Sequence, residues 1–257
     1  MIIDVHCHVG HSPDQYVPDC SVETMLRTMD NLGIDIAIGC NTYCLTLMDF
    51  KGGTEFASRI YKESKGRLRN YFYYHPDYPE ECLKIMSSFE GDPAFCGVKI
   101  HPALSYTDAD DEKYRPVWEY ASKHDLIIQS HTWDFSNYNP KQKYSYPLKF
   151  EKYVKEYSDV KLIIAHSGGR YGGIKAAAEL GKRYSNVYFD TAGDIWVNGY
   201  IEYMVQNVGS DHIMYGSDYA MMDQRLMLGV VVGADIPLQD KENILCNTAR
   251  KVFAKYF

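Results

Sequence analysis

The segment Ile2-Ile3-Asp4-Val5-His6-Cys7-His8 stands at the start of the chain and has the composition of a buried β-strand. Its apolar residues are mainly β-branched, which is typical of strands. His6 and His8 are two residues apart, so their side chains point to the same face of a strand. The segment therefore predicts a strand that carries two imidazoles at its C-terminal end.

Seven further segments repeat this strand pattern, and stretches of helical composition separate them. The strand-like segments span residues 2–8, 34–40, 68–74, 95–101, 126–131, 160–166, 187–190 and 212–217. The helical stretches span residues 21–32, 53–64, 79–90, 111–123, 147–157, 172–184, 195–208 and 240–256. Strands that alternate with helices pair in parallel, because each helix returns the chain to the same end of the sheet.

The number and spacing of these units indicate a closed barrel. The 257 residues give about 32 residues per unit, and a (β/α)8 TIM barrel typically has about 250 residues. An open doubly wound sheet is the alternative, but it usually carries a glycine-rich phosphate-binding turn after its first strand, and the sequence has none there. We therefore predict an α/β fold in which residues 1–257 form a single TIM-barrel domain.

Composition narrows the class of protein. The chain has 27 basic and 34 acidic residues and no basic run, which argues against a nucleic-acid partner. No apolar stretch reaches the roughly 18–20 residues of a membrane span. The chain begins directly with a strand-like segment, without a cleavable signal, and its seven cysteines are scattered. These features predict a reduced, cytoplasmic protein with no membrane partner.

Polar residues gather at the predicted C-terminal ends of the strands, where TIM barrels carry their chemistry. Asp190 and Asp218 lie there. So do five of the nine histidines: His6, His8, His101, His131 and His166. Imidazole and carboxylate ligands suit zinc, manganese, iron or cobalt. We therefore predict a divalent metal site at this end of the barrel, with one position open for water.

At these residues the sequence resembles the amidohydrolase superfamily, and within it the branch often called amidohydrolase 2. The matching segments are residues 3–8, 97–102, 166–169 and 215–218, together with His131 and the closing segment 243–253. They follow one another along the whole chain in the order that the family shows. The resemblance implies a distorted TIM barrel with one or two divalent metals and a small-molecule substrate.

The resemblance also implies roles for individual residues. In the mononuclear members of the branch, the residues that correspond to His6, His8, His131 and Asp218 bind the metal. The residue that corresponds to His166 stands near the metal and polarises substrate or water. One zinc ion is the first expectation, and manganese, iron and cobalt are the alternatives.

These roles agree with elementary chemistry. A bound metal lowers the pKa of its water to about 7. Asp218 would accept a proton from that water and pass it to the leaving group. His166 would stabilise the charge that develops on an attacked carbonyl oxygen. Asp218 and His166 are therefore the predicted catalytic residues, and Asp4 is a candidate for orienting the end of the first strand.

Lys99 has two interpretations. In binuclear relatives a lysine on the fourth strand is carbamylated and bridges two metals, which requires a neutral amine. Alternatively, Lys99 is an inward-pointing cation that pairs with an aspartate or contacts an anionic substrate. The surrounding Gly97-Val98-Lys99-Ile100-His101-Pro102 resembles the mononuclear branch, so a second metal is the less favoured alternative. His101 is expected to line the rim of the barrel.

Two loop residues and Asp190, at a strand end, are further candidates for the substrate site. Arg170 would hold a substrate carboxylate in bidentate fashion, or it is an ordinary surface arginine. Trp133 belongs to an aromatic-rich loop after the fifth strand, which would form a pocket wall, a lid or a contact in a homodimer. Asp190 is expected to contact His166 or the substrate.

Hydrolysis of a C–N or C–O bond by metal-activated water is the function that we favour from sequence. The alternative is non-oxidative, metal-dependent decarboxylation of an aromatic or enoic acid, because several members of the branch share this ligand set. Phosphoester cleavage is less favoured, because Lys99 and His101 occupy the place where nuclease-like relatives carry a glutamate. A non-catalytic barrel is also disfavoured, because every expected ligand is present.

Overall fold

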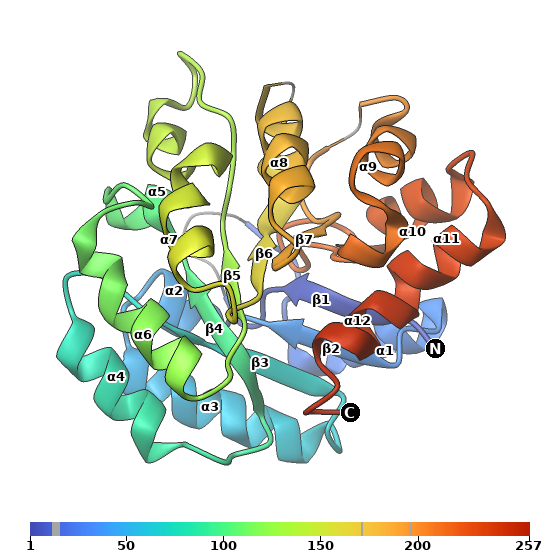
Figure 1. The fold of residues 1–257 in the computed structure, drawn as a ribbon. Coiled ribbons are helices and arrows are strands. Elements are labelled where there is room, and N and C mark those ends of the chain that lie inside the picture. The colour runs from blue at the N-terminus through green and yellow to red at the C-terminus, as the bar shows by residue number, and fades with distance from the viewer. Residues whose placement is uncertain (12–15, 171, 196) are drawn as a thin grey trace.

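Eight parallel strands form the centre of the molecule (Figure 1). The structure is a computed structural model that describes residues 1–11, 16–170, 172–195 and 197–257. Each strand pairs with the next one along the chain, in the order β1 to β8. The strands are β1 (Ile3–Cys7), β2 (Ile36–Gly39), β3 (Leu68–Tyr73), β4 (Phe95–Ile100), β5 (Ile128–Ser130), β6 (Leu162–Ile164), β7 (Val187–Asp190) and β8 (Ile213–Met214).

The barrel closes between β1 and the segment that follows β8. Val5 N donates to Tyr215 O at 2.9 Å, and the backbone N–H groups of Ser217 and Asp218 donate to His6 O at 3.1 and 2.8 Å. Because β8 is only two residues long, these bonds are made by irregular backbone. The predicted TIM barrel is therefore confirmed, with its distortion at the closing seam.

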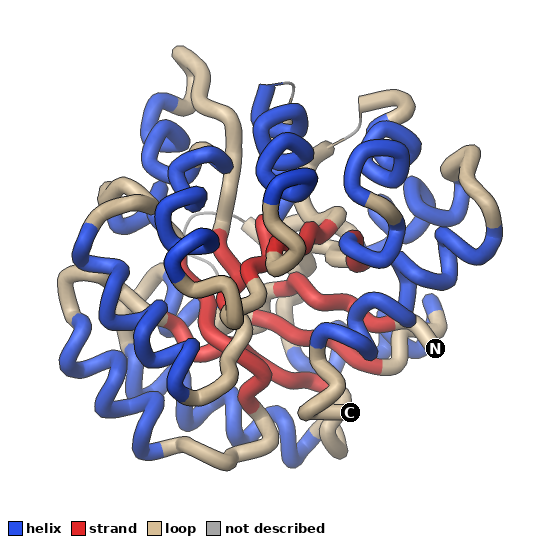
Figure 2. The backbone as a smooth tube through the Cα atoms, in the orientation of Figure 1, coloured by secondary structure: helices blue, strands red, loops and turns tan. Residues whose placement is uncertain are grey.

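Helices surround the strands (Figure 2). The first half of the chain supplies α1 (Val22–Leu32), α2 (Thr42–Leu45), α3 (Phe50–Glu63), α4 (Pro79–Ser88), α5 (Pro102–Ser105) and α6 (Arg115–Lys123). The second half supplies α7 (Glu151–Glu156), α8 (Gly172–Arg183), α9 (Tyr200–Val208), α10 (Gln224–Gly233), α11 (Leu238–Glu242) and α12 (Thr248–Val252).

Several predicted boundaries were wrong for local reasons. The Asp49 side chain caps α3 by accepting from Gly52 N at 2.9 Å, so this helix begins at Phe50 rather than at residue 53. The predicted helix 240–256 begins earlier, at Leu238, and ends at Val252, with a π-helical segment at Asn243–Asn247 between α11 and α12. Helix α10 was not predicted, because its valines and glycines are poor helix formers, yet the Asp223 side chain caps it.

The interior of the barrel is apolar at one end. One buried cluster joins residues of all eight strand regions to the last helix, and such residues can meet only inside the barrel. Its members include Ile3, Val5, Ile38, Tyr71, Cys96, Ile127, Ile163, Tyr188 and Met214, together with Val252 and Phe253 at the end of α12. The last helix therefore closes the N-terminal end, and the buried polar side chains collect at the opposite end.

Outside the barrel, a larger apolar cluster fills the layer between the strands and the helices. Within the described ranges, no helix combines the length and the apolar composition needed to cross a membrane.

We predict that Gly97→Ala destabilises the barrel by about 1–3 kcal/mol, because there is no space for the added methyl group. A Cβ atom at Gly97 would lie 2.5 Å from Ile127 O, and that oxygen is held by a 2.8 Å hydrogen bond from Val98 N. The free energy of unfolding in urea measures the effect. Gly229→Ala on α10 is the control, because a Cβ atom there meets nothing within 4 Å. Equal stability of the two variants would contradict the prediction.

Candidate metal centre

Strand β1 brings His6 and His8 to one point at the C-terminal end of the barrel. Both imidazoles are buried, with exposed fractions of 1% and 5%. Their Nε2 atoms lie 3.5 and 3.2 Å from Oδ1 of Asp218, which follows β8 in a left-handed backbone conformation. One ligand atom from each of the three residues lies within 4.8 Å of the others. Sequence reasoning predicted this convergence.

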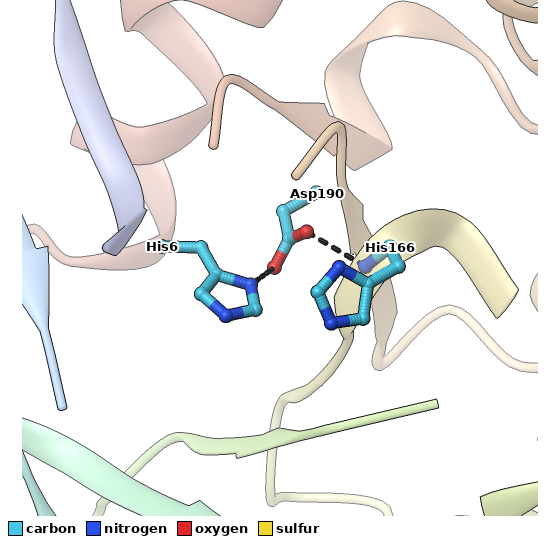
Figure 3. Close-up of side chains that lie close together, drawn as sticks. All are labelled: His6, His166 and Asp190. Carbon is cyan, nitrogen blue, oxygen red and sulfur yellow. Dashed lines mark hydrogen bonds and ion pairs between the residues drawn. The ribbon is translucent and has the colours of Figure 1, made fainter. Parts of the chain in front are cut away.

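The remaining ring nitrogens of the two histidines are hydrogen-bonded to the protein. His6 Nδ1 lies 2.9 Å from Oδ2 of Asp190 (Figure 3), and His8 Nδ1 lies 3.0 Å from the Cys40 carbonyl oxygen. Both partners are acceptors, so both Nδ1 atoms carry hydrogen and both Nε2 lone pairs are directed at Asp218. Metal-ligating histidines show this arrangement. Two imidazole nitrogens and a carboxylate oxygen thus fit a zinc-type ion.

Asp190 belongs to a second group of ligand atoms, with His6 and His166. Its oxygens already accept several hydrogen bonds, however. Besides the His6 bond, Oδ2 accepts from Gln129 Nε2 at 3.1 Å, and Oδ1 accepts from His166 N at 2.8 Å and Ala192 N at 3.1 Å. These four donors account for the lone pairs of a carboxylate. Asp190 therefore orients His6, and the group with His8 and Asp218 is the stronger metal site.

His166 lies on a 3-10 turn over Ala165–Gly168, not on the predicted strand. His166 and Ser167 both have left-handed backbone, with φ of 58° and 44°. Such conformations cost about 1–3 kcal/mol each and concentrate at functional sites. The turn is held by the Ser167 hydroxyl, which donates to Asp190 O at 2.7 Å. A Cβ atom at Gly193 would lie 2.7 Å from His166 Nδ1, so only glycine leaves space for this ring.

His131 lies beside the three converging ligands rather than among them. Its Nδ1 is 3.0 Å from His166 Nε2, and its Nε2 is 2.9 Å from Gln142 Oε1. The ring stacks on His101, with 3.9 Å between centroids. His101 is held in turn, because its Nδ1 accepts from Leu104 N at 3.2 Å. The role of His131 as a metal ligand stays a prediction.

Lys99 is buried next to the candidate ligands. Its Nζ lies 3.2 Å from His6 Nε2 and donates to Gln129 Oε1 at 3.0 Å. Burial lowers the pKa of Lys99, which favours the neutral amine. Both interpretations of Lys99 remain open, since it faces the cavity that contains the candidate ligands.

Burial sets the protonation states of the site. It holds the pKa of His6 and of His131 well below the usual range, and it lowers the pKa of His166 to about 4. Burial alone would raise the pKa of Asp218, but its interactions with the neighbouring imidazoles of His8, His166 and His6 outweigh burial and hold that pKa below its usual range. Neutral imidazoles and an ionised carboxylate are the states that bind a metal ion.

Asp4 connects β1 to the segment that carries Asp218. Its Oδ1 accepts from the backbone N–H groups of His6 and Ser217 at 3.1 Å each. Its Oδ2 accepts from Ser217 Oγ at 2.5 Å and from Gln224 Nε2 of α10 at 3.2 Å. Asp4 thus contacts the backbone of His6 rather than its imidazole, and it positions the closing seam of the barrel.

Two cavities meet at the site. A cavity of about 200 Å³ contains His6, His8 and Lys99, and one of about 650 Å³ opens toward the loop after β5. Asp218, His131, His166 and Met221 line both.

The loop candidates Trp133 and Arg170 lie in the wall of the larger cavity. The Arg170 guanidinium forms an ion pair with Asp194 and lies 5.8 Å from the centre of the Trp133 ring. The predicted loop residues are therefore brought together at the entrance to the metal centre.

Sequence reasoning missed two glutamines of the site. Gln129 links Lys99 to Asp190, and its position two residues before His131 on a strand placed it on the same face as that histidine. Gln142 accepts from His131, but it lies in a loop turn over Pro140–Ser145, where no strand periodicity exists to reveal it.

The model of the amidohydrolase family, in its amidohydrolase 2 form, matches residues 3–255. The chain belongs to this family. It is an enzyme of the amidohydrolase superfamily, whose chemistry depends on a metal, and the His6, His8 and Asp218 cluster agrees with that. A search of curated protein sequences found no match.

Solved structures share the fold of this amidohydrolase at low sequence identity. 2,6-Dihydroxybenzoate decarboxylase from Rhizobium is 14% identical, with a TM-score of 0.77 over 99% of this chain and 98% of that one. A dihydroxybenzoic acid decarboxylase from Polaromonas, with bound manganese and 2-nitroresorcinol, is 14% identical, with a TM-score of 0.75 over 98% and 96%. 4-Oxalomesaconate hydratase from Rhodopseudomonas palustris is 15% identical, with a TM-score of 0.74 over 99% and 96%.

We predict that Asp190→Asn weakens zinc binding by about 10–100-fold, because His6 loses the carboxylate that fixes its ring. Competition with a chromogenic chelator measures the affinity. Asp211→Asn is the control. Asp211 lies on the turn before β8, is exposed and forms an ion pair with Lys251. Wild-type affinity in a folded Asp190→Asn protein would show that Asp190 does not orient the ligand.

Proposed function

We propose that this amidohydrolase is a metal-dependent hydrolase that cleaves a C–N or C–O bond of a small molecule with one bound zinc ion. The observation that carries the proposal is the convergence of His6 Nε2, His8 Nε2 and Asp218 Oδ1 beside a cavity. When bound there, a divalent metal would act as a Lewis acid that activates water and polarises a substrate oxygen.

Asp218 is the proposed general base and acid. It lines both cavities, so its carboxylate is accessible to water and substrate. One of its oxygens lies 3.2 Å from His8 Nε2, where a bound metal ion would hold both groups. A carboxylate in this position takes a proton from the attacking water and returns it to the leaving nitrogen or oxygen.

His166 is the proposed stabiliser of the charge on the attacked group. Its ring lines both cavities and is fixed by the strained turn, so no reorganisation is needed when charge develops. Burial keeps the imidazole neutral. Its Nε2–H, which lies 3.0 Å from His131 Nδ1, would share its hydrogen bond with the carbonyl oxygen of the substrate.

Arg170 and Trp133 are the proposed substrate-binding residues. The guanidinium would share its hydrogen bonds between Asp194 and a carboxylate of the substrate, and the indole would pack against the substrate's planar part.

Decarboxylation is the second candidate. An arginine at the entrance of the cavity that Asp218 lines suits a substrate carboxylate equally well. Two decarboxylases also share the fold of this chain along nearly their whole length, which agrees with this candidate.

A comparison of substrates tests the proposed reaction. Metal-stripped protein, reloaded with zinc or manganese, is incubated with panels of amides, esters, lactones and aromatic acids. We expect hydrolysis in the first three panels, at least about 100-fold slower turnover after chelation, and recovery on reloading. Carbon dioxide release from the aromatic acids without any hydrolysis would support the second candidate. Full turnover by stripped protein would contradict both.

We also predict that Arg170→Met raises KM for a carboxylate substrate by about 10–100-fold, because a hydrogen bond to a charged group contributes about 1.5–3 kcal/mol. The uncharged analogue of the same substrate should show little change in KM. Arg225→Met is the matched control, since Arg225 is exposed and pairs with Asp223. An equal change for charged and uncharged substrates would show that Arg170 does not bind the carboxylate.

A further inference from the structure

The His131 ring is held on its face and on both nitrogens. Its face stacks on His101 at an interplanar angle of 9°, and the Trp133 indole lies parallel at 6.3 Å. In the plane of the ring, Nε2 meets Gln142 Oε1 and Nδ1 meets His166 Nε2. A neutral imidazole has one N–H and one lone pair, so these two contacts determine which nitrogen carries the hydrogen.

Gln142 presents its amide oxygen to His131. The Gln142 side chain is buried, with an exposed fraction of 7%, and lies in the turn Pro140–Ser145. The same oxygen accepts from Ser145 Oγ at 2.9 Å. An amide oxygen can only accept, so His131 donates its Nε2–H to Gln142. Its Nδ1 then carries a lone pair and accepts the Nε2–H of His166.

His166 gives independent support for this direction. Its Nδ1 is buried and has no hydrogen-bond partner among the described residues. With the direction reversed, His166 would accept at Nε2, and its hydrogen would sit on the buried Nδ1 without an acceptor. A buried N–H without a partner is rarer than a buried acceptor without one. The hydrogen bonds therefore run from His166 to His131 and from His131 to Gln142.

We propose that Gln142 is a positioning residue that fixes His131 in the Nε2–H tautomer, so that its lone pair lies on Nδ1, the nitrogen that faces His166. The inference deepens the proposed function, because His131 and His166 are residues of that site. It implies that the residue at position 142 must offer an acceptor to His131.

The tautomer can be read directly by NMR. Zinc-loaded protein labelled with ¹⁵N-histidine is measured by long-range ¹H–¹⁵N correlation, which distinguishes an Nε2–H ring from an Nδ1–H ring. The His131 signals are those that disappear in His131→Gln. We expect the Nε2–H pattern in the wild-type protein. An Nδ1–H pattern would overturn the proposal, and this comparison needs no substitution at Gln142.

Substitutions at Gln142 then test the cause. Gln142→Glu keeps an acceptor for His131 and should keep the Nε2–H pattern. Gln142→Leu removes the acceptor and should give a mixture of tautomers. Ser145→Ala is the control, because it removes the other donor to Oε1 and leaves the His131 bond in place. A single, wild-type tautomer in folded Gln142→Leu would overturn the role of Gln142.

The NMR result is independent of turnover. The tautomer pattern is measured without substrate, so it can fail while metal-dependent hydrolysis is observed. Equally, the Nε2–H pattern can be found in a protein for which the substrate panels show no hydrolysis.

Turnover gives a second readout. The kcat should fall by about 10–100-fold in Gln142→Leu and recover in Gln142→Glu, as for other residues that orient histidines at metal sites. Failure of the glutamate to restore kcat would contradict the acceptor role.

Discussion

The hydrogen bonds of the Asp190 carboxylate hold the candidate metal centre together. A single buried side chain at the end of β7 accepts from the His6 imidazole of β1, from Gln129 of β5 and from the backbone of His166 after β6. The positions of His6 and His166 both depend on it, although these residues lie far apart in the sequence. The cost of burying a carboxylate is offset only when its lone pairs are satisfied, as they are here.

The barrel can bury the Asp190 carboxylate because its interior has an apolar end and a polar end. Apolar residues fill the end that the last helix covers, and they fix the strand positions without using polar groups. The other end collects the imidazoles, Lys99, Asp190 and Asp218. Asp4 stabilises the boundary between β1 and the closing segment, where regular strand pairing ends. The site therefore lies where the sheet is irregular, and its geometry depends on side-chain hydrogen bonds more than on the sheet ladder.

The sequence was sufficient to predict the barrel and part of the candidate metal centre. Period-two spacing placed His6 and His8 on one face, and the order of the units placed Asp218 beside them. It was not sufficient for the backbone conformation of His166, because a left-handed turn stabilised by Ser167 and Gly193 depends on contacts between distant segments. Gln142 lies in a loop without periodicity, and its role follows only from its contact with His131. Strand periodicity thus predicts candidate metal ligands. The residues that orient these ligands are identified only from the structure.

We propose that His6, His8 and Asp218 hold the catalytic metal while Asp190 orients His6. Anomalous diffraction from crystals of the zinc-loaded enzyme tests it most directly. We predict one zinc ion per chain, at about 2.0–2.2 Å from His6 Nε2, His8 Nε2 and an oxygen of Asp218. An ion bound instead between His166 and Asp190, or the absence of zinc from the His6, His8 and Asp218 cluster in fully loaded protein, would contradict the account.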